Sequence, residues 1–262
     1  PEIVQPDYLY PVIESQVMYD PSETSVVIAD LKTIIATAIQ NYSEGSLTKF
    51  STYYRHSVLT SLIDVAERSI KSNLTKVKLR KPFSPTLNAK LSYVIKFSNP
   101  LYHPHSGHMS ILSSTRFSYL HSGDLYLGCS LTDQDGIVQI TQRLRDGSTR
   151  FLKNTGTIDY DSGIVNLQDF NPMTILGGGS DINLIVEPKH SDLIPAFNQL
   201  ITIDPNDVSI TLVDDRQLTS TDRPVTSGDY AVSRGTYSIS DTGIPSSTSG
   251  GAGSDGSSSG GY

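Results

Sequence analysis

Hydrophobic residues between positions 25 and 70 recur at intervals of three and four, which is the period of an amphipathic helix. Apolar side chains keep this spacing from Val27 to Tyr42, and after Gly45 the same period resumes and continues to Ile70. We therefore predict two helices in this part of the chain, each of which buries one face.

At Asn73 the pattern changes to the strict alternation of a β-strand. Residues 74–80 and 91–97 both alternate apolar with polar side chains, and residues 81–85 between them have the composition of a turn. We predict that these two strands pair as a hairpin. The helices would cover one face of the small sheet, which makes an α+β domain of residues 22–98.

Short strand-like segments separated by turn residues follow from residue 99 to residue 213. They are found at residues 110–117, 125–132, 136–141, 149–152, 157–167, 173–176, 182–188 and 208–213. Short strands at regular spacing predict a mainly antiparallel β-rich domain over residues 99–213.

The clearest local signal is the stretch from Gly156 to Leu167, in which two alternating runs flank Asp161-Ser162-Gly163. This is the composition of a three-residue β-hairpin loop whose glycine takes the left-handed conformation. A larger residue at Gly163 is expected to splay the two strands or to shift their register.

The two ends of the chain differ from the rest. Residues 1–21 contain four prolines with three tyrosines among them, which favours an extended arm laid along another surface. Beyond Asp214 the hydrophobic content collapses, so residues 214–262 are predicted to be an irregular Gly/Ser-rich tail that only contacts outside the chain's own core would order. The predicted fold class is thus α+β, with N-terminal helices packed on a small sheet, a mainly antiparallel β domain and an irregular tail.

Composition narrows the class of protein. Hydrophobic residues make up 37% and charged residues 18% of the 262 positions, which favours strands and turns over long surface helices. A net charge of −7 argues against binding to nucleic acid. The single Cys129 excludes an internal disulfide, and no apolar run approaches the ~20 residues that span a membrane.

Two candidate ligand sites are weak. His103, His105 and His108 fall close together with His121 not far away, and imidazoles bind transition metals, but the spacing matches no strong motif and an ordinary polar loop is favoured. The Gly177–Ser180 run lacks the Gly-Lys-Ser/Thr ending of a phosphate loop, so a hairpin connection is favoured.

Acidic residues offer candidates as well. Asp133-Gln134-Asp135 begins like a calcium loop, but no Glu stands at the twelfth position, so it is interpreted as a turn. Asp159, Asp161 and Asp169 could supply the two carboxylates of a glycosidase, yet turn chemistry already explains the first two. We predict no catalytic, cofactor-binding or metal-binding residue, and hence a protein that is not an enzyme.

Three stretches also resemble a known family. They are the hairpin sequence G-T-I-D-Y-D-x-G, the segment D-L-I-P-A-F-N-Q-L-I-T-I that ends at Ile203, and the run from Leu47 to Asn73 followed by V-K-L-R-K-P-F. Together they resemble the baseplate wedge subunit of T4-like contractile-tailed bacteriophages and, more loosely, the baseplate J-like family. The resemblance covers residues 26–213. It implies that the chain is the C-terminal portion of such a subunit and that an upstream portion precedes Pro1.

The resemblance implies a structural protein of the virion that is assembled in the host cytoplasm. It implies self-association, as a homodimer within a larger ring around the tail tube, and contacts with other baseplate wedge proteins, with no nucleic acid or membrane as a partner. The alternative is a β-rich carbohydrate-binding or receptor-binding module of a tail protein. The 14 tyrosines favour this alternative, and the absence of tryptophan, the usual platform for sugar stacking, disfavours it.

Overall fold

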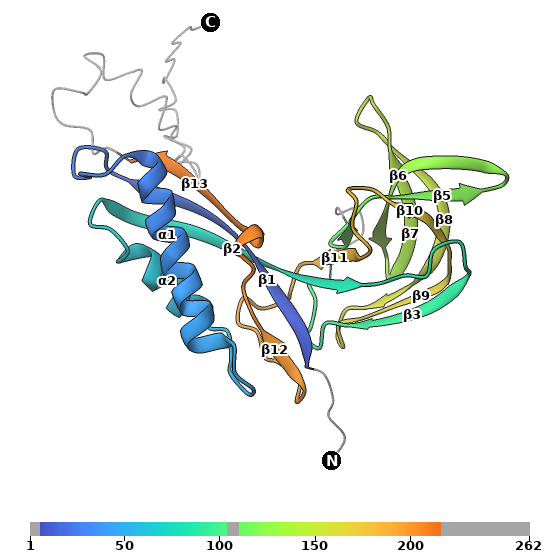
Figure 1. Ribbon diagram of the computed structural model, residues 1–262, viewed down its shortest axis with the longest axis horizontal. Coiled ribbons are helices and arrows are strands. Elements are labelled where there is room, and N and C mark those ends of the chain that lie inside the picture. Colours follow the sequence, from blue (N-terminus) through green and yellow to red (C-terminus); the bar gives the residue numbers. More distant parts are fainter. Residues whose placement is uncertain (1–5, 104–109, 216–262) are drawn as a thin grey trace, which may run out of the picture. The chain divides into compact units, whose positions relative to one another are not determined.

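The strands of this protein form two separate sheets, as the computed structural model in Figure 1 shows. The structure describes residues 6–103 and 110–215, which belong to one compact unit. Strand residues make up 49% of this part of the chain and helical residues 16%. We call the two the mixed sheet and the antiparallel sheet.

The mixed sheet is built around β1 (Asp7–Tyr19), which has strands on both sides. β2 (Ile70–Phe83) runs antiparallel to β1 along most of its length. On the other edge β12 (Gln199–Ile201) and β13 (Val208–Asp214) run parallel to β1, one after the other. Pro11 lies in the gap between them, where the missing N–H removes no bond to either strand. The predicted arm thus contains a central strand, and this strand accommodates its single proline because Pro11 falls in the gap.

The mixed sheet continues beyond the end of β2. β11 (Ile182–Val186) pairs antiparallel with the last residues of β2, and β4 (Ser113–Ser114) pairs with β11. A short 3-10 helix, η2 (Pro205–Asp207), separates β12 from β13. The sheet therefore draws its strands from both the beginning and the end of the described chain.

The second sheet is wholly antiparallel. Its strands are β3 (Leu91–Lys96), β5 (Phe117–His121), β6 (Asp124–Gln134), β7 (Ile137–Arg143), β8 (Thr149–Asp159), β9 (Ile164–Phe170) and β10 (Pro172–Ile175). They lie in the order β10-β5-β6-β7-β8-β9-β3, so most neighbours are consecutive in the sequence. The predicted hairpin is confirmed as β8 and β9, with Gly163 at a φ of +66°.

Two α-helices cover one face of the mixed sheet. α1 (Ile28–Tyr42) contacts β13 and runs into a π-helical turn, η1 (Ser43–Leu47), while α2 (His56–Asp64) contacts β2. The second predicted helix is shorter than expected, because helical structure stops at Asp64 and strand pairing begins at Ile70.

The predicted α+β fold class is wrong. The fold is mostly β, with two curled sheets and only two α-helices in the described residues, and the sheet under the helices is not a small hairpin. β2 and β3, predicted to pair with each other, belong to different sheets, because alternation identifies a strand but not its neighbour. The connection through Gly177 and Gly178 likewise joins β10 of one sheet to β11 of the other. The predicted tail lies outside the described residues from residue 216 onward.

An aromatic cluster joins the two sheets where β2 ends. The ring of Phe83 lies 5.4 Å from that of Tyr93 and 6.2 Å from that of Phe170. Phe170 in turn meets Phe117 edge-on at 5.2 Å. These side chains extend one hydrophobic core from the mixed sheet into the antiparallel sheet.

Candidate assembly surface

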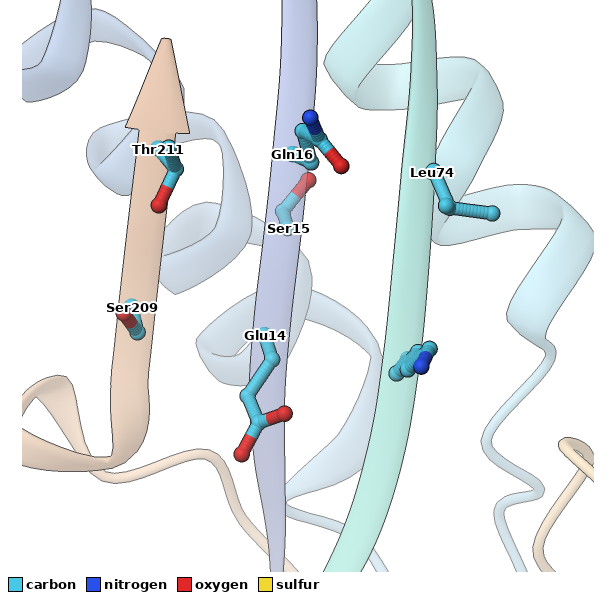
Figure 2. Close-up of a pocket in the computed structure, with 7 residues that line it drawn as sticks. Glu14, Ser15, Gln16, Leu74, Ser209 and Thr211 are labelled. Carbon is cyan, nitrogen blue, oxygen red and sulfur yellow. The ribbon is translucent and has the colours of Figure 1, made fainter.

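The mixed sheet has one covered and one open face. Successive β1 side chains point to opposite faces, and Ile13 and Val17 are fully buried on the side of the helices. Glu14 and Gln16 point the other way, and Figure 2 shows them in front of the strands with the helices behind. No helix or strand of the described residues covers this open face in that view.

A shallow hollow of ≈ 190 Å³ crosses β13, β1 and β2 on this face. It is lined by Glu14, Ser15, Gln16, Leu74, Lys76, Ser209 and Thr211. Small-molecule sites usually enclose about 300–1,000 Å³. The open face therefore suits contact with another macromolecular surface better than capture of a small ligand.

Arg80 of β2 binds the segment that joins β12 to β13. Its Nε donates to Asp207 Oδ2 at 2.6 Å, and its terminal nitrogens donate to Asp204 Oδ2 at 3.2 Å and to Asn183 Oδ1 at 3.0 Å. The guanidinium also lies 4.3 Å from the ring centre of Tyr10. Burial raises the pKa of Asp207, and the ion pair with Arg80 opposes that rise. This network fixes the turn before β13 and thereby places β13 beside β1.

A second buried cation fixes β12. Lys81 is 8% exposed, and its Nζ donates to Asp7 Oδ2 at 2.5 Å and to the carbonyl of Lys96 at 2.6 Å. The side-chain amide of Gln199 donates to the same Asp7 oxygen at 3.0 Å. One ammonium group thus holds the start of β1 and the end of β3, and the Asp7 carboxylate links them to the start of β12.

A residue distant in sequence anchors the start of α2. The carboxylate of Asp192 accepts from the backbone N–H of His56 at 2.9 Å and from Arg55 at 2.9 Å. These bonds hold the pKa of Asp192 below its usual range. Since Arg55 offers no capping side chain of its own, Asp192 replaces the missing N-cap.

The burial of His56 makes stability depend on pH. Burial lowers its pKa in the folded protein, so the unfolded chain binds a proton more readily. We expect the free energy of unfolding to decrease as the pH is lowered from 7 through about 6.5, the ordinary imidazole pKa. Urea unfolding at several pH values should show a smaller decrease for His56→Asn than for the wild type. The exposed His190→Asn serves as control, and an unchanged slope in His56→Asn would contradict the assignment.

The acidic residues near the hairpin serve the turn. Asp159 accepts from the Ser162 hydroxyl at 2.5 Å and from the backbone N–H groups of Asp161 and Ser162 at 3.0 and 3.3 Å. The Ser162 bonds hold the pKa of Asp159 below its usual range. Asp161 and Asp169 are exposed, and Asp169 has a φ of +47°. The turn interpretation of Asp159 is therefore confirmed.

The buried role of Asp133 was not predicted from the sequence. The turn lies at the following Asp135 and Gly136, whereas Asp133 belongs to β6 and is 5% exposed. Its carboxylate accepts from the backbone N–H of Leu112 at 2.8 Å and from the hydroxyl of Tyr160 at 2.7 Å. Alternation along β6 could have placed it on the buried face, but the turn composition concealed that signal.

The histidine candidates are only partly described. His103 stacks on the ring of Tyr160 at 4.7 Å, whereas His105 and His108 lie outside the described residues. His121 lies on β5, 6.4 Å from the ring of Tyr119. Within residues 6–103 and 110–215 no group of three His, Cys, Asp or Glu side chains could hold a metal ion.

A larger hollow, of ≈ 390 Å³, lies over β3, β8 and β9. Its lining is largely polar, with Thr157, Asn166 and Gln168. Tyr93 contributes to it, but its ring packs against Phe83 and its hydroxyl accepts from the Thr86 N–H at 2.8 Å. Tyr93 thus has both its ring and its hydroxyl in contact with other residues of the protein, and the remaining lining residues supply no second aromatic ring for a sugar to stack on.

Comparison with known sequences assigns a class. None of the helices described here is long and apolar enough to cross a membrane. The first part of the chain matches a family of phage proteins. This match supports the conclusion that the chain is a structural component of the tail baseplate. Such a component is located in the virion and contacts other baseplate components. The family is described as baseplate structural protein gp6, C-terminal domain III, and the match covers residues 7–82. No curated protein sequence matches the chain.

The matched residues coincide with a structural unit. They begin with β1 and end one residue before the end of β2, with both α-helices between. The match also includes residues 7–19, which the resemblance found in the sequence left out. It omits β12 and β13, which complete the sheet around β1.

Proposed function

We propose that this chain is a wedge subunit of the baseplate of a contractile phage tail, and that it self-associates as a homodimer within a ring around the tail tube. The match of residues 7–82 to a baseplate structural protein carries the proposal. The hairpin and the segment ending at Ile203 also resemble such a subunit. Both lie outside the matched range, so this resemblance supports the proposal independently of the match.

In this proposal the protein acts through its surfaces. Assembly rests on buried apolar area and on strand pairing between subunits. The open face of the mixed sheet supports this view, because it presents three strands of mainly polar side chains without a cover among the described residues. We include in the proposal that the chain is not an enzyme, binds neither nucleic acid nor membrane, and is assembled in the host cytoplasm with other wedge proteins.

The first test is the molar mass of the 262-residue chain in solution. Size-exclusion chromatography with light scattering, repeated over a wide range of protein concentrations, is expected to give a mass that rises toward twice the 28.5 kDa of one chain. A strict monomer at every concentration would contradict self-association through this portion. It would strengthen the alternative of a carbohydrate-binding or receptor-binding module.

The absence of turnover can be tested separately. Alanine at Asp159 or Asp161 is expected to abolish no measurable hydrolysis of glycans or peptides, because the Asp159 carboxylate serves the hairpin turn and Asp161 lies in the loop, where its backbone N–H donates to Asp159. Hydrolysis by the wild type that disappears in Asp159→Ala would overturn this part of the proposal.

A further inference from the structure

β13 is an open edge of the mixed sheet. Within the described residues it pairs with β1 alone, and Figure 2 shows no further strand on its outer side. An exposed edge presents unpaired N–H and C=O groups to which another strand can bind. Proteins usually protect such edges with lysine, proline or a bulge. The seven residues of β13, VSITLVD, contain neither residue, and their pairing with β1 has no register shift.

The direction of the backbone N–H and C=O groups determines which residues of β13 can bond to a further strand. The N–H of Asp215 donates to the carbonyl of Tyr19 at 2.8 Å, so the odd-numbered residues here bond toward β1. Consecutive residues of a strand direct their backbone groups to opposite edges. Ile210 and Leu212 therefore direct both of theirs to the open edge, whereas the N–H of Val208 donates to the carbonyl of Pro205. The side chains of all three residues pack against the hydrophobic core.

The side chains of β13 are complementary to a second copy of themselves. Aliphatic side chains alternate with hydroxyl side chains over residues 208–212, so the order of these two types is the same in either direction along the strand. In an antiparallel pair centred on Ile210, that residue faces its own copy. Val208 would then face Leu212 of the copy on the core side, and Ser209 would face Thr211 on the open side. A two-fold interface requires such self-complementarity, and this register places no like charges opposite each other within the paired residues.

We infer that β13 pairs antiparallel with β13 of a second copy of this chain, so that two mixed sheets form one continuous sheet. The inference rests on the self-association proposed above and names its surface. A standard protein–protein interface buries about 1,600 Å² of accessible surface area, and two short strands bury less than this. The dimer is accordingly expected to dissociate on dilution.

A charge placed at this edge tests the pairing. Thr211→Lys puts an ammonium group on the open face of β13, opposite Ser209 of the copy and diagonal to the ammonium group that the same substitution places on that copy. We expect the dissociation constant of the dimer, from light scattering or sedimentation, to rise up to about fivefold, because cross-strand contacts are worth about 0.2–1 kcal/mol. Asn154→Lys is the control, because Asn154 is an exposed residue of β8, a central strand of the antiparallel sheet that lies outside the candidate assembly surface. Its dissociation constant should stay at the wild-type value.

A disulfide tests the register without relying on Thr211→Lys remaining folded. The double variant Ser209→Cys, Thr211→Cys should form a covalent dimer on mild oxidation, with peptides linked between positions 209 and 211 of different chains. Asn154→Cys, at an exposed position of the central strand β8 in the antiparallel sheet, should not. A dimer that is insensitive to Thr211→Lys and forms no such cross-link would overturn the edge pairing while leaving self-association intact. A monomer at all concentrations would overturn both.

Discussion

Replacing Gly163 by valine is expected to abolish most of the folded yield of this protein. The φ of +66° at this position is in the left-handed region, which costs a residue with a Cβ about 1–2 kcal/mol. A Cβ there would also lie only 2.1 Å from the carbonyl oxygen of Asn99. The hairpin would have to move away from Asn99, whose side chain binds both backbone groups of Ile194. The combined loss should exceed about 4 kcal/mol, which is exceptional for one substitution.

The measurement is the recovered yield of folded protein together with the urea midpoint. Gly147→Val is the matched control, because Gly147 also has a positive φ, +87°, but nothing lies within 4 Å of a Cβ placed there. The free energy of unfolding of this control should decrease by about 1–2 kcal/mol, which is the cost of the left-handed conformation alone. Equal losses in the two variants would show that the close approach to Asn99 has no energetic weight.

Arg80→Met is expected to be the second most damaging change. The side chain of Arg80 is 14% exposed, and its removal leaves the carboxylates of Asp204 and Asp207 without a counter-charge. Breaking a buried ion pair costs about 3–5 kcal/mol, and because the Asp204 side chain is 32% exposed we expect a loss at the lower end of this range. Urea unfolding would give the loss, and hydrogen exchange should show β13 opening more readily than β7, which has paired neighbours on both sides.

A pH series separates the charge effect from lost packing. The penalty of Arg80→Met should shrink as the pH is lowered, because protonation of Asp207, whose pKa burial raises, removes the uncompensated charge. Arg55→Met removes an ion pair with Asp192 in which both side chains are mostly exposed, 55% and 44%, and it should cost no more than about 1 kcal/mol. A penalty for Arg80→Met that is independent of pH would contradict the electrostatic explanation.

Local features of this fold could be predicted from the sequence. The spacing of Leu31, Ile35 and Ile39 locates α1, whose buried face they form. The loop at Gly163 and the strands that it joins follow from turn composition and alternation. Each of these inferences concerns residues that interact within one element or one hairpin.

The neighbours of each strand could not be predicted in the same way. β1 is flanked by segments from near residues 80 and 210, and no pattern inside β1 records which segments these are. Its prolines suggested an arm because proline is rare inside sheets, and only the arrangement of β12 and β13 explains why Pro11 is tolerated. The network around Arg80 likewise depends on residues 124 and 127 positions away, so its members could not be identified as a group.

The parallel pairing of β1 with β12 and β13 sets the order in which the chain can be completed during synthesis. Gln199 reaches Asp7 across 192 residues. The antiparallel sheet can form largely as its hairpins leave the ribosome, because most of its neighbouring strands are consecutive. One edge of β1 remains unpaired until β12 and β13 have been synthesised, and during this time it can pair with other nascent chains. β1, the first of the described strands to be synthesised, is thus the last to be fully paired.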